Sequence, residues 1–241
     1  MKIIILCEGT TDLLMLQFVL QYKYHWKYEG FVENSVTNRL IKRKFIKNDS
    51  KVEICSCGGI MNISNEMVRV KETIEYATKV DEIFDKVIIM IDHDTENSNQ
   101  EFIRKLNELL GVDFGLERIN AETNWSIENN ILGNKNISLY IKCVPEKETG
   151  AIENVMLDAL NTDAVENLLI DRSKEFITKL ATEQDRYLQR KSRLYKAIFN
   201  TYFAIRTPEE KYDERARILK AFDWEKNECL EKQFSFLDID I

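Results

Sequence analysis

The chain has 241 residues, of which 44% are hydrophobic and 31% charged, values that are ordinary for a globular protein with one large domain or one domain and a helical extension. Only 2 prolines and 8 glycines occur, which argues against disorder, and no apolar run approaches the ~20 residues that are needed to cross a bilayer. The net charge of −7 argues against a broad cationic surface for nucleic acid, so such contacts would depend on a local basic patch or on bound cations.

Strands and helices are predicted to alternate in the first two thirds of the chain. The apolar segment 2–7 predicts a strand that is buried on both faces, and a helix is expected at about 11–22. Further strands are predicted at 52–57, 87–91 and 139–144, and further helices at about 62–79, 99–110 and 151–160. This order predicts βαβ units and therefore an α/β fold with a parallel sheet of about four strands, flanked by helices.

The pattern changes in the last third of the chain, where helical periodicity dominates and no strand is predicted. We therefore predict an α/β domain over residues 1–162, with an insertion at about 21–51, and an α-helical C-terminal extension over residues 163–241. The start of the chain has a short apolar run that ends at Glu8 and not at a small-residue cleavage site, so we interpret it as a strand. Five cysteines without metal-ligand spacing indicate reduced thiols and a cytoplasmic protein.

Acidic residues follow two of the predicted strands. Glu8 follows the first strand, and Asp92 and Asp94 follow the third. Ligands of parallel sheets gather at the carboxyl ends of the strands, and carboxylate oxygens suit hard cations such as Mg²⁺. Asp92 and Asp94 are two residues apart and are expected to project to one side, with His93 on the other. The alternative for each acid alone is a solvated loop residue, and for Asp12 an acid that stabilises the start of its helix.

Together these motifs resemble the Toprim domain, which is shared by type IA and II topoisomerases, DnaG-type primases, RecR-like proteins and OLD-family nucleases. The resemblance covers about residues 1–162. It depends on Glu8-Gly9-x-x-Asp12, on Gly58-Gly59 after the second strand, and on Asp92-x-Asp94. Within this group the chain is most similar to the OLD-family (overcoming lysogenization defect-like) nucleases, which carry a second acid four residues after the first Glu and a further Glu after the fourth strand.

The resemblance implies a site for about two Mg²⁺ or Mn²⁺ ions. Glu8, Asp92 and Asp94 match the acids of the Toprim motif and would be catalytic, Asp92 and Asp94 as metal ligands and Glu8 as a metal ligand or proton acceptor. Asp12 and Glu153 match the two additional acids of the OLD-like branch and would complete a second metal position. Asp12 departs from the Glu that is more typical there.

OLD-like nucleases also place a lysine late in the catalytic region, where it offsets phosphate charge. Lys191 is our candidate for this catalytic role, because it interrupts an apolar stripe in a helix that is predicted at about 183–204. The alternative is that Lys191 only extends its ammonium group to solvent.

The predicted insertion mixes aromatic and basic side chains, most densely at 22–28. Aromatic rings can stack on bases while cations follow the phosphates, so we expect nucleic-acid contacts here; the alternative is the solvated basic face of a linker. The candidate contact residues are Lys23, Trp26, Lys27, Lys42, Arg43 and Lys44.

These expectations combine into a Mg²⁺- or Mn²⁺-dependent nuclease that acts on DNA or RNA, tRNA included, because two oxygen-bound ions can activate water and neutralise a phosphodiester. The resemblance implies a separate ABC-type ATPase as partner and a role in phage defence, and we also consider a homodimer. No membrane contact is expected. Two alternatives remain: a non-catalytic Toprim module that binds nucleic acid or a protein partner, and a phosphohydrolase or phosphotransferase that acts on a small nucleotide in a closed pocket.

Overall fold

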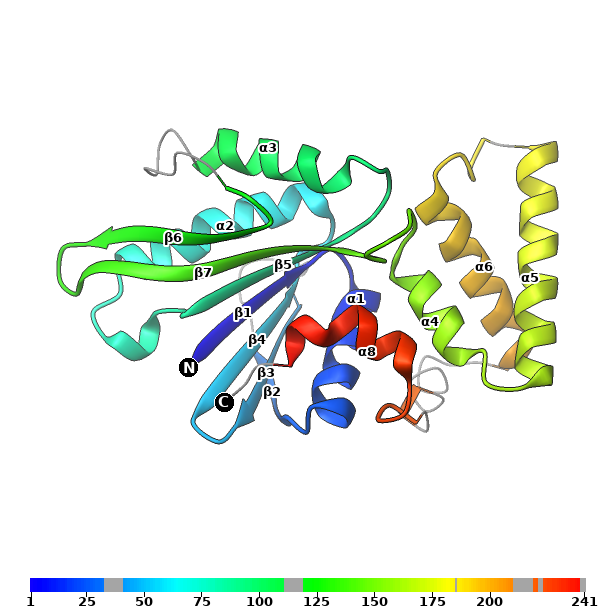
Figure 1. Cartoon of the computed structure of the whole chain (residues 1–241), viewed down its shortest axis with the longest axis horizontal. Coiled ribbons are helices and arrows are strands. Elements are labelled where there is room, and N and C mark those ends of the chain that lie inside the picture. Colours follow the sequence, from blue (N-terminus) through cyan, green and yellow to red (C-terminus); the bar gives the residue numbers. More distant parts are fainter. Residues whose placement is uncertain (33–40, 111–118, 185, 210–218, 221–222, 239–241) are drawn as a thin grey trace. The chain divides into compact units, whose positions relative to one another are not determined.

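The computed structural model describes residues 1–32, 41–110, 119–184, 186–209, 219–220 and 223–238. By their internal contacts these residues divide into two compact units, and each unit is described by itself (Figure 1). The first unit contains Met1–Ile91 and Asn97–Cys143, and the second contains Asp92–Glu96 and Val144–Asp238. The larger segment of the second unit starts at Val144, and the domain boundary at about residue 162 stays a prediction.

A seven-stranded mixed sheet, in the order β2-β3-β4-β1-β5-β7-β6, organises the first unit (Figure 1). Strand β1 pairs in parallel with β4 and β5, while the pairs β2–β3, β3–β4 and β6–β7 are antiparallel. The strands are β1 (Lys2–Cys7), β2 (Lys27–Val32), β3 (Ile41–Lys47), β4 (Ser50–Ser56), β5 (Lys86–Asp92), β6 (Glu122–Asn129) and β7 (Gly133–Val144).

The sheet is larger than the parallel sheet of about four strands that the sequence predicted. The four expected strands correspond to β1, β4, β5 and β7, and the three additional strands are β2, β3 and β6. In β6 only Trp125, Ile127 and Asn129 are buried, in strict alternation with more exposed residues, and in β3 only Phe45 is buried. Such strands lack the continuous apolar run of a fully buried strand, which is the pattern that the prediction relied on.

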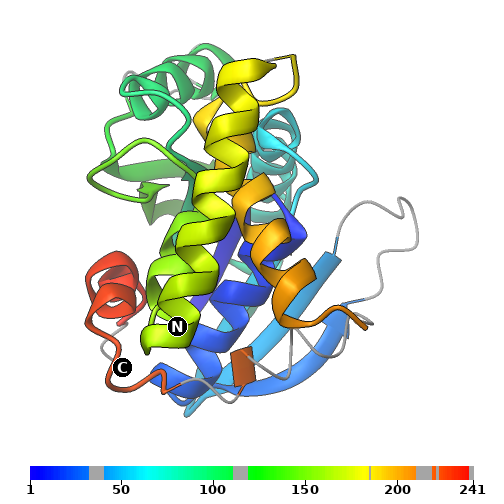
Figure 2. The same ribbon diagram turned by 90° about the vertical axis from the view of Figure 1, so that its right-hand side faces the viewer.

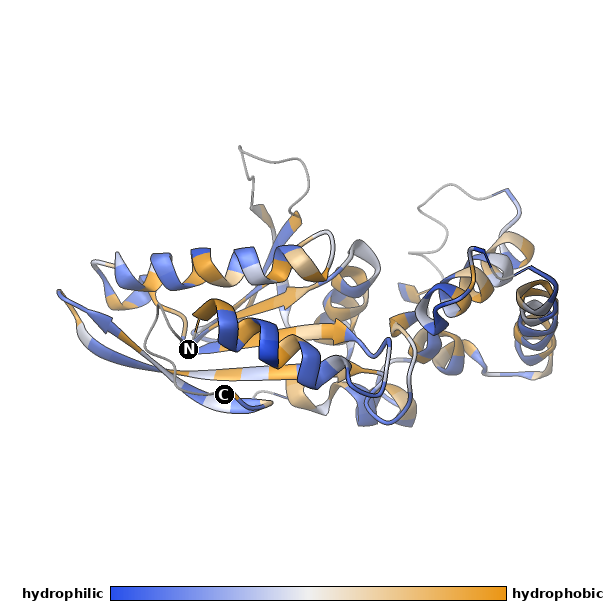
Figure 3. Cartoon of the chain, turned by 90° about the horizontal axis from the view of Figure 1, so that it is seen from above, coloured by the Kyte–Doolittle hydropathy of each residue, from blue (hydrophilic) through white to orange (hydrophobic). Residues whose placement is uncertain are grey.

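Helices cover both faces of this sheet. Helices α2 (Ile60–Glu75) and α3 (Ser98–Leu110) lie on one face, where their apolar side chains join those of the strands in a single core (Figure 1). Helix α1 (Thr10–Phe18) continues into a π-helical turn, η1 (Val19–Lys23), on the other face. A short 3₁₀ turn, η2 (Val80–Glu82), precedes β5. Hydrophobic residues dominate the inner strands, whereas the helices show hydrophilic and hydrophobic bands, as expected for amphipathic helices (Figure 3).

The second unit is helical. It contains α4 (Ile152–Leu160), α5 (Ala164–Glu183), α6 (Lys191–Arg206), α8 (Glu228–Phe234) and the 3₁₀ turn η3 (Ser235–Leu237). Helices α5 and α6 pack side by side (Figure 2), and α4 contacts α6 and α8. A helix was predicted at about 183–204. In the structure Glu183 is the last residue of α5, and the next helix, α6, begins at Lys191. None of the helices in the described part of the chain is long and apolar enough to cross a membrane.

Candidate functional site

The carboxyl ends of β1 and β4 meet through the backbone of Glu8. The amide of Gly59 donates a hydrogen bond to the carbonyl of Glu8 at 2.8 Å, and the amide of Cys57 donates to the carbonyl of Cys7 at 2.9 Å. Gly58 and Gly59 have φ angles of 73° and 124°, which residues with a side chain rarely adopt. The glycine pair of the sequence motif is therefore a backbone requirement of this turn, which leads directly into α2.

Asp12 has a local structural role in the first turn of α1. Its side chain is buried, and Oδ2 accepts a hydrogen bond of 2.6 Å from the amide of Gly9, the N-cap residue. A carboxylate at this position also interacts favourably with the helix dipole. This geometry corresponds to the helix-stabilising alternative for Asp12, and it is compatible with a second role for the other carboxylate oxygen.

The Cys7 thiol lies near Glu8 and Asp12 but is not suited to act as a nucleophile. Burial raises the pKa of Cys7 well above its usual range, and the neighbouring Asp12, Cys55 and Glu8 raise it further. The thiol therefore stays protonated, and its Sγ contacts the carbonyl oxygen of Cys55 at 3.4 Å. Cys7 behaves as a small core residue.

The end of β5 carries a second acidic cluster, which is assembled from distant parts of the chain. Asp92 is only 6% exposed. Its Oδ2 forms an ion pair of 2.7 Å with the Nζ of Lys196 from α6, and its Oδ1 accepts a hydrogen bond of 3.3 Å from the amide of Ile152 in the first turn of α4. Lys196 is 46% exposed, so its ammonium group also reaches water.

The surroundings of Asp92 disfavour its negative charge in spite of these partners. Burial raises the pKa of Asp92, the charge and hydrogen bond of Lys196 and the amide of Ile152 lower it, and the charge of Asp94 raises it again; the net result is a raised pKa. A nearby carboxylate makes a buried acid such as Asp92 harder to ionise. The cluster would consequently gain from additional positive charge.

Asp94 supplies the clearest sign of such a need. Its Oδ1 atom is buried and receives no hydrogen bond from the residues that the structure describes. A buried carboxylate oxygen without a donor is costly, and a bound cation would remove that cost.

His93, between the two acids, is occupied by structural hydrogen bonds. Its amide donates to the carbonyl of Val144 at 3.2 Å, its carbonyl accepts from the amide of Gly150 at 2.7 Å, and its Nδ1 lies 2.9 Å from the carbonyl oxygen of Pro145. These bonds hold the segment after β5 against the loop that precedes α4.

Glu153 and Lys191 lie in the same unit as Asp92. Glu153 is buried in the first turn of α4, directly after Ile152, where the helix dipole favours a negative charge. Lys191, the first residue of α6, donates a hydrogen bond of 2.7 Å to Oγ1 of Thr149 and is exposed. The lysine that contacts Asp92 is Lys196. Sequence reasoning missed it, because nothing in its local pattern distinguishes it from other lysines of the helix.

The donor set fits a hard cation in its chemistry but not as a complete site. Asp92 and Asp94 offer carboxylate oxygens, the ligands that Mg²⁺ and Mn²⁺ prefer. No group of three or more His, Cys, Asp or Glu side chains that could hold a metal ion is present among the described residues. At Asp92, the ammonium group of Lys196 provides the positive charge, so a metal ion would have to compete with this lysine.

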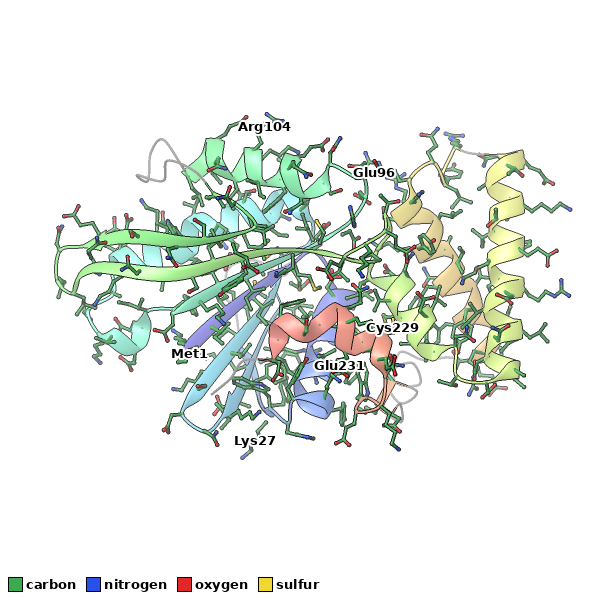
Figure 4. The ribbon with its side chains drawn as sticks, in the orientation of Figure 1. Met1, Lys27, Glu96, Arg104, Cys229 and Glu231 are labelled. Carbon is green, nitrogen blue, oxygen red and sulfur yellow. The ribbon has the colours of Figure 1, made fainter. Side chains whose placement is uncertain are left out.

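The basic residues of the predicted insertion fall into two groups. Lys27, which is exposed (Figure 4), lines with Lys44 a shallow hollow of about 440 Å³ over β2 and β3. Tyr28 and Phe31 line the same hollow, and Phe31 is 68% exposed. Sequence reasoning did not select Phe31, which lies in the edge strand β2 and pairs with Arg43 of the basic strand β3.

Lys44 also forms an ion pair of 3.9 Å with Glu53, and three of the remaining candidates are buried or face other side chains. Trp26 is 3% exposed and offers no face to a base. Lys42 forms an ion pair of 2.6 Å with the buried Glu66; burial by itself lowers the pKa of Lys42, but the hydrogen bond and charge of Glu66 raise it overall. Arg43 is hydrogen-bonded to Gln17, and its guanidinium group lies 5.3 Å from the centre of the Phe31 ring. Lys23 ends the π-helical turn after α1.

These observations define a mixed α/β protein with an acidic cluster at the end of a central strand and a helical second unit. Over residues 2–237 the chain matches the family model described as protein of unknown function (DUF3226), and it belongs to this family. A search of curated proteins finds no match. The hypothetical protein PH0156 from Pyrococcus horikoshii OT3 has a similar fold, with a TM-score of 0.50 and 15% identity over 98% of this chain and 100% of that one. The Toprim resemblance stays a prediction.

Proposed function

We propose that the protein is a divalent-metal-dependent phosphodiesterase of Toprim type that hydrolyses nucleic acid, with Asp92 and Asp94 as ligands of Mg²⁺ or Mn²⁺. The observation that carries this proposal is the buried Oδ1 atom of Asp94, which receives no hydrogen bond from the described residues, beside a second carboxylate whose pKa is raised. Buried acids with perturbed pKa values are concentrated at functional sites. Glu8, Asp12 and Glu153 stay predicted ligands.

Lys196 would have two successive roles in this proposal. Before a metal ion binds, its ammonium group neutralises Asp92. When bound, the ion would polarise the phosphodiester and lower the pKa of attacking water. Lys196, released from Asp92 and half exposed, would then offset the charge of the phosphate oxygens. We therefore propose Lys196 for the part that the resemblance assigned to Lys191.

Cleavage assays on the purified protein test this proposal. Plasmid, single-stranded DNA and tRNA would be incubated with Mg²⁺ or Mn²⁺, using wild type, Asp94→Asn, Asp92→Asn and Glu8→Gln. Glu96→Gln is the matched control, because Glu96 is an exposed acid on the same segment (Figure 4). We expect the Asp variants to lose at least ~100-fold in rate, as for an electrostatic contact in an active site. Metal-dependent cleavage that survives in Asp94→Asn would refute the assignment.

The surface that we propose for nucleic acid is the hollow lined by Lys27, Phe31 and Lys44. Lys27 and Lys44 would follow phosphates, and the exposed ring of Phe31 would stack on a base. Phe31→Ala is expected to weaken binding of single-stranded DNA or RNA by roughly 1–3 kcal/mol, the usual worth of one stacked base. Tyr76→Ala, which removes a 79% exposed aromatic ring elsewhere on the first unit, should leave binding unchanged.

A second candidate is a non-catalytic Toprim-like module that binds nucleic acid or a protein partner. The ion pair between Lys196 and Asp92 favours it, because this lysine already supplies the positive charge at Asp92. Thermal unfolding with and without Mn²⁺ separates the two candidates. An ion held by Asp92 and Asp94 raises the melting temperature of wild type but not that of Asp94→Asn. A module without a metal site would show no shift in either protein and would keep its nucleic-acid binding in Asp92→Asn.

The compartment of the protein is proposed from its cysteines, and its partner from the resemblance. No disulfide links the five cysteines, so we propose the cytoplasm as its compartment. A separate ABC-type ATPase and a part in phage defence stay predictions from the resemblance. Co-purification with an ATPase encoded beside this protein, and its loss on substitution of exposed residues, would test the partner.

A further inference from the structure

A run of positive charge precedes and begins helix α6 in the second unit. From Arg186 to Lys196 there are five basic residues and no acidic one, although the whole chain has a net charge of −7. Four of them, Arg186, Arg190, Lys191 and Arg193, are exposed. A solvated helix usually mixes charges of both signs, so a run of one sign in an acidic protein indicates a surface that binds an anion.

The place of these cations in the helix is unfavourable for the fold. Helix α6 begins at Lys191, and its first turn contains no acidic residue. The helix dipole puts partial positive charge at this end, so Lys191 and Arg193 lie where a cation lowers helix stability, and Arg190 at the N-cap adds to the effect. Stability alone would favour acidic residues here. Chains retain such unfavourable groups where they bind or react.

Three of the cations form a row that reaches the acidic cluster at the end of β5. Arg190 precedes Arg193 by three residues, and Arg193 precedes Lys196 by three, so each side chain lies beside the next along the helix surface. Lys196 ends the row at Oδ2 of Asp92, at 2.7 Å. Arg190 and Arg193 form no ion pair with any residue that the structure describes, so their charges are available to a ligand.

We propose that this row, Arg190, Arg193 and Lys196, binds the phosphates of a nucleic-acid strand and leads that strand to Asp92 and Asp94. The inference rests on the proposed function for the identity of the anion. Six residues of helix rise about 9 Å, and one strand carries about three phosphates over that length, at ~3.4 Å each. Three cations therefore match about three phosphates. Guanidinium groups also suit phosphate oxygens, to which they donate two hydrogen bonds at once.

An exposed aromatic ring beside the row favours a single strand as the ligand. Tyr187 is 62% exposed, and the guanidinium group of Arg186 lies 5.3 Å from the centre of its ring. A ring of this kind can stack on a base only if the base is not already paired and stacked in a duplex. This surface lies in the second unit, as the acidic cluster does, whereas the hollow lined by Lys27, Phe31 and Lys44 lies in the first.

Fluorescence anisotropy with a labelled single-stranded oligonucleotide, full-length protein and no divalent metal tests the row. The double variant Arg190→Gln/Arg193→Gln should raise the dissociation constant roughly 10-fold or more, as for loss of a charge-assisted hydrogen bond. It should also lower the slope of log affinity against log salt by about 1.4, or ~0.7 for each lost phosphate contact. Arg172→Gln/Lys179→Gln is the matched control, because it removes two exposed cations from α5, in the same unit.

The control should keep most of the affinity and of the salt slope. Equal losses in the two double variants would mean that only net charge matters and would overturn the proposal, as would wild-type affinity in Arg190→Gln/Arg193→Gln. Affinity for poly-L-glutamate equal to that for the oligonucleotide would indicate an acidic protein as the ligand and would also overturn it. Thermal unfolding guards against misfolding, since removing cations from the start of α6 should leave the melting temperature at or above that of wild type.

Cleavage kinetics separate this inference from the proposed function. The row holds the strand and does not touch the bond that is cleaved, so Arg190→Gln/Arg193→Gln should raise KM and leave kcat nearly unchanged. Asp94→Asn should instead lower kcat. A protein that binds through the row but never cleaves would contradict the proposed function alone. A protein that cleaves with an unchanged KM in Arg190→Gln/Arg193→Gln would contradict this inference alone.

Discussion

The two acidic clusters of this protein differ in how their carboxylates are held. Strands β1 and β5 are parallel neighbours, and acids follow both at their carboxyl ends. At β1, Asp12 binds the amide of Gly9, three residues earlier in the chain. At β5, Asp92 binds the amide of Ile152 and the ammonium group of Lys196, which are 60 and 104 residues away in sequence.

Asp12 is therefore an acid that stabilises the fold, whereas the burial of Asp92 as a charged group is unfavourable. The carboxylate of Asp12 completes the start of a helix, a role that any protein can use. Asp92 is buried beside a second carboxylate, and the net effect of its surroundings is to raise its pKa. Chains retain such unfavourable groups where they bind or react, so the cluster at β5 is the stronger candidate for function. Four predictions test this contrast, from the largest expected effect to the smallest.

The largest effect is expected from Gly59→Val, at the turn that joins β4 to α2 beside the end of β1. Gly59 has a φ of 124°, and its amide binds the carbonyl of Glu8. A branched side chain in this conformation should lower the free energy of unfolding by roughly 1–3 kcal/mol in urea denaturation. Met61→Ala, two residues later and 67% exposed, is the control and should change it by less than ~0.5 kcal/mol. Equal effects of the two substitutions would mean that the turn adapts without strain.

Asp12→Ala is expected to destabilise the protein by about 1 kcal/mol, because the amide of Gly9 loses its acceptor and the helix loses its N-terminal acid. Asp12→Asn keeps an acceptor oxygen and should cost less. Chemical denaturation of both variants provides the measurement. If Asp12→Ala left stability unchanged but abolished a metal-induced rise in melting temperature, Asp12 would be a metal ligand and not a helix-stabilising acid.

The sequence predicted those parts of the fold that depend on local pattern. Strands β1 and β5 are continuous apolar runs and were located to within one residue. Strands β3 and β6 of the antiparallel part of the sheet were not predicted. The reason is that β3 is basic along most of its length and β6 alternates between buried and exposed residues. A basic run, and an alternation in which only Trp125 and Ile127 are apolar, are weak signals for a strand, so pairing with the neighbouring strand decides both cases.

The residues of the candidate cluster at β5 could be selected from the sequence only in part. Asp92 and Asp94 could be selected because it was enough to know that they follow a buried strand. Lys196 could not be selected, because its contact with Asp92 depends on how α6 packs within the second unit. Trp26 shows the converse error, since a tryptophan among lysines suggests a base-stacking surface, whereas its side chain is buried.

Asp92→Asn should affect stability in the opposite direction to Asp12→Ala. The amide oxygen of Asn can still accept the hydrogen bond from Ile152, and Lys196, which is 46% exposed, can turn to water. Removing the buried charge should therefore raise the free energy of unfolding by roughly 0.5–1 kcal/mol at neutral pH, a gain typical of substitutions at strained functional positions. Glu96→Gln, on the same segment, should change nothing. A loss of stability in Asp92→Asn would mean that the ion pair with Lys196 outweighs the cost of burial.

The smallest effect is the pH dependence of that gain, and its sign follows from the raised pKa of Asp92. Because the folded state holds the proton more tightly than the unfolded state does, Asp92 adds stability at pH values below the ordinary pKa of an aspartate. This contribution is lost as the pH rises through the pKa of the folded state. Asn does not titrate, so the advantage of Asp92→Asn over wild type should be near zero in acid, grow through this range, and then stay constant up to neutral pH. Unfolding curves for both proteins at a series of pH values would measure it. An advantage that instead shrinks as the pH rises would show that the folded state favours the ionised carboxylate, and Asp92 would then resemble Asp12 as a stabilising acid.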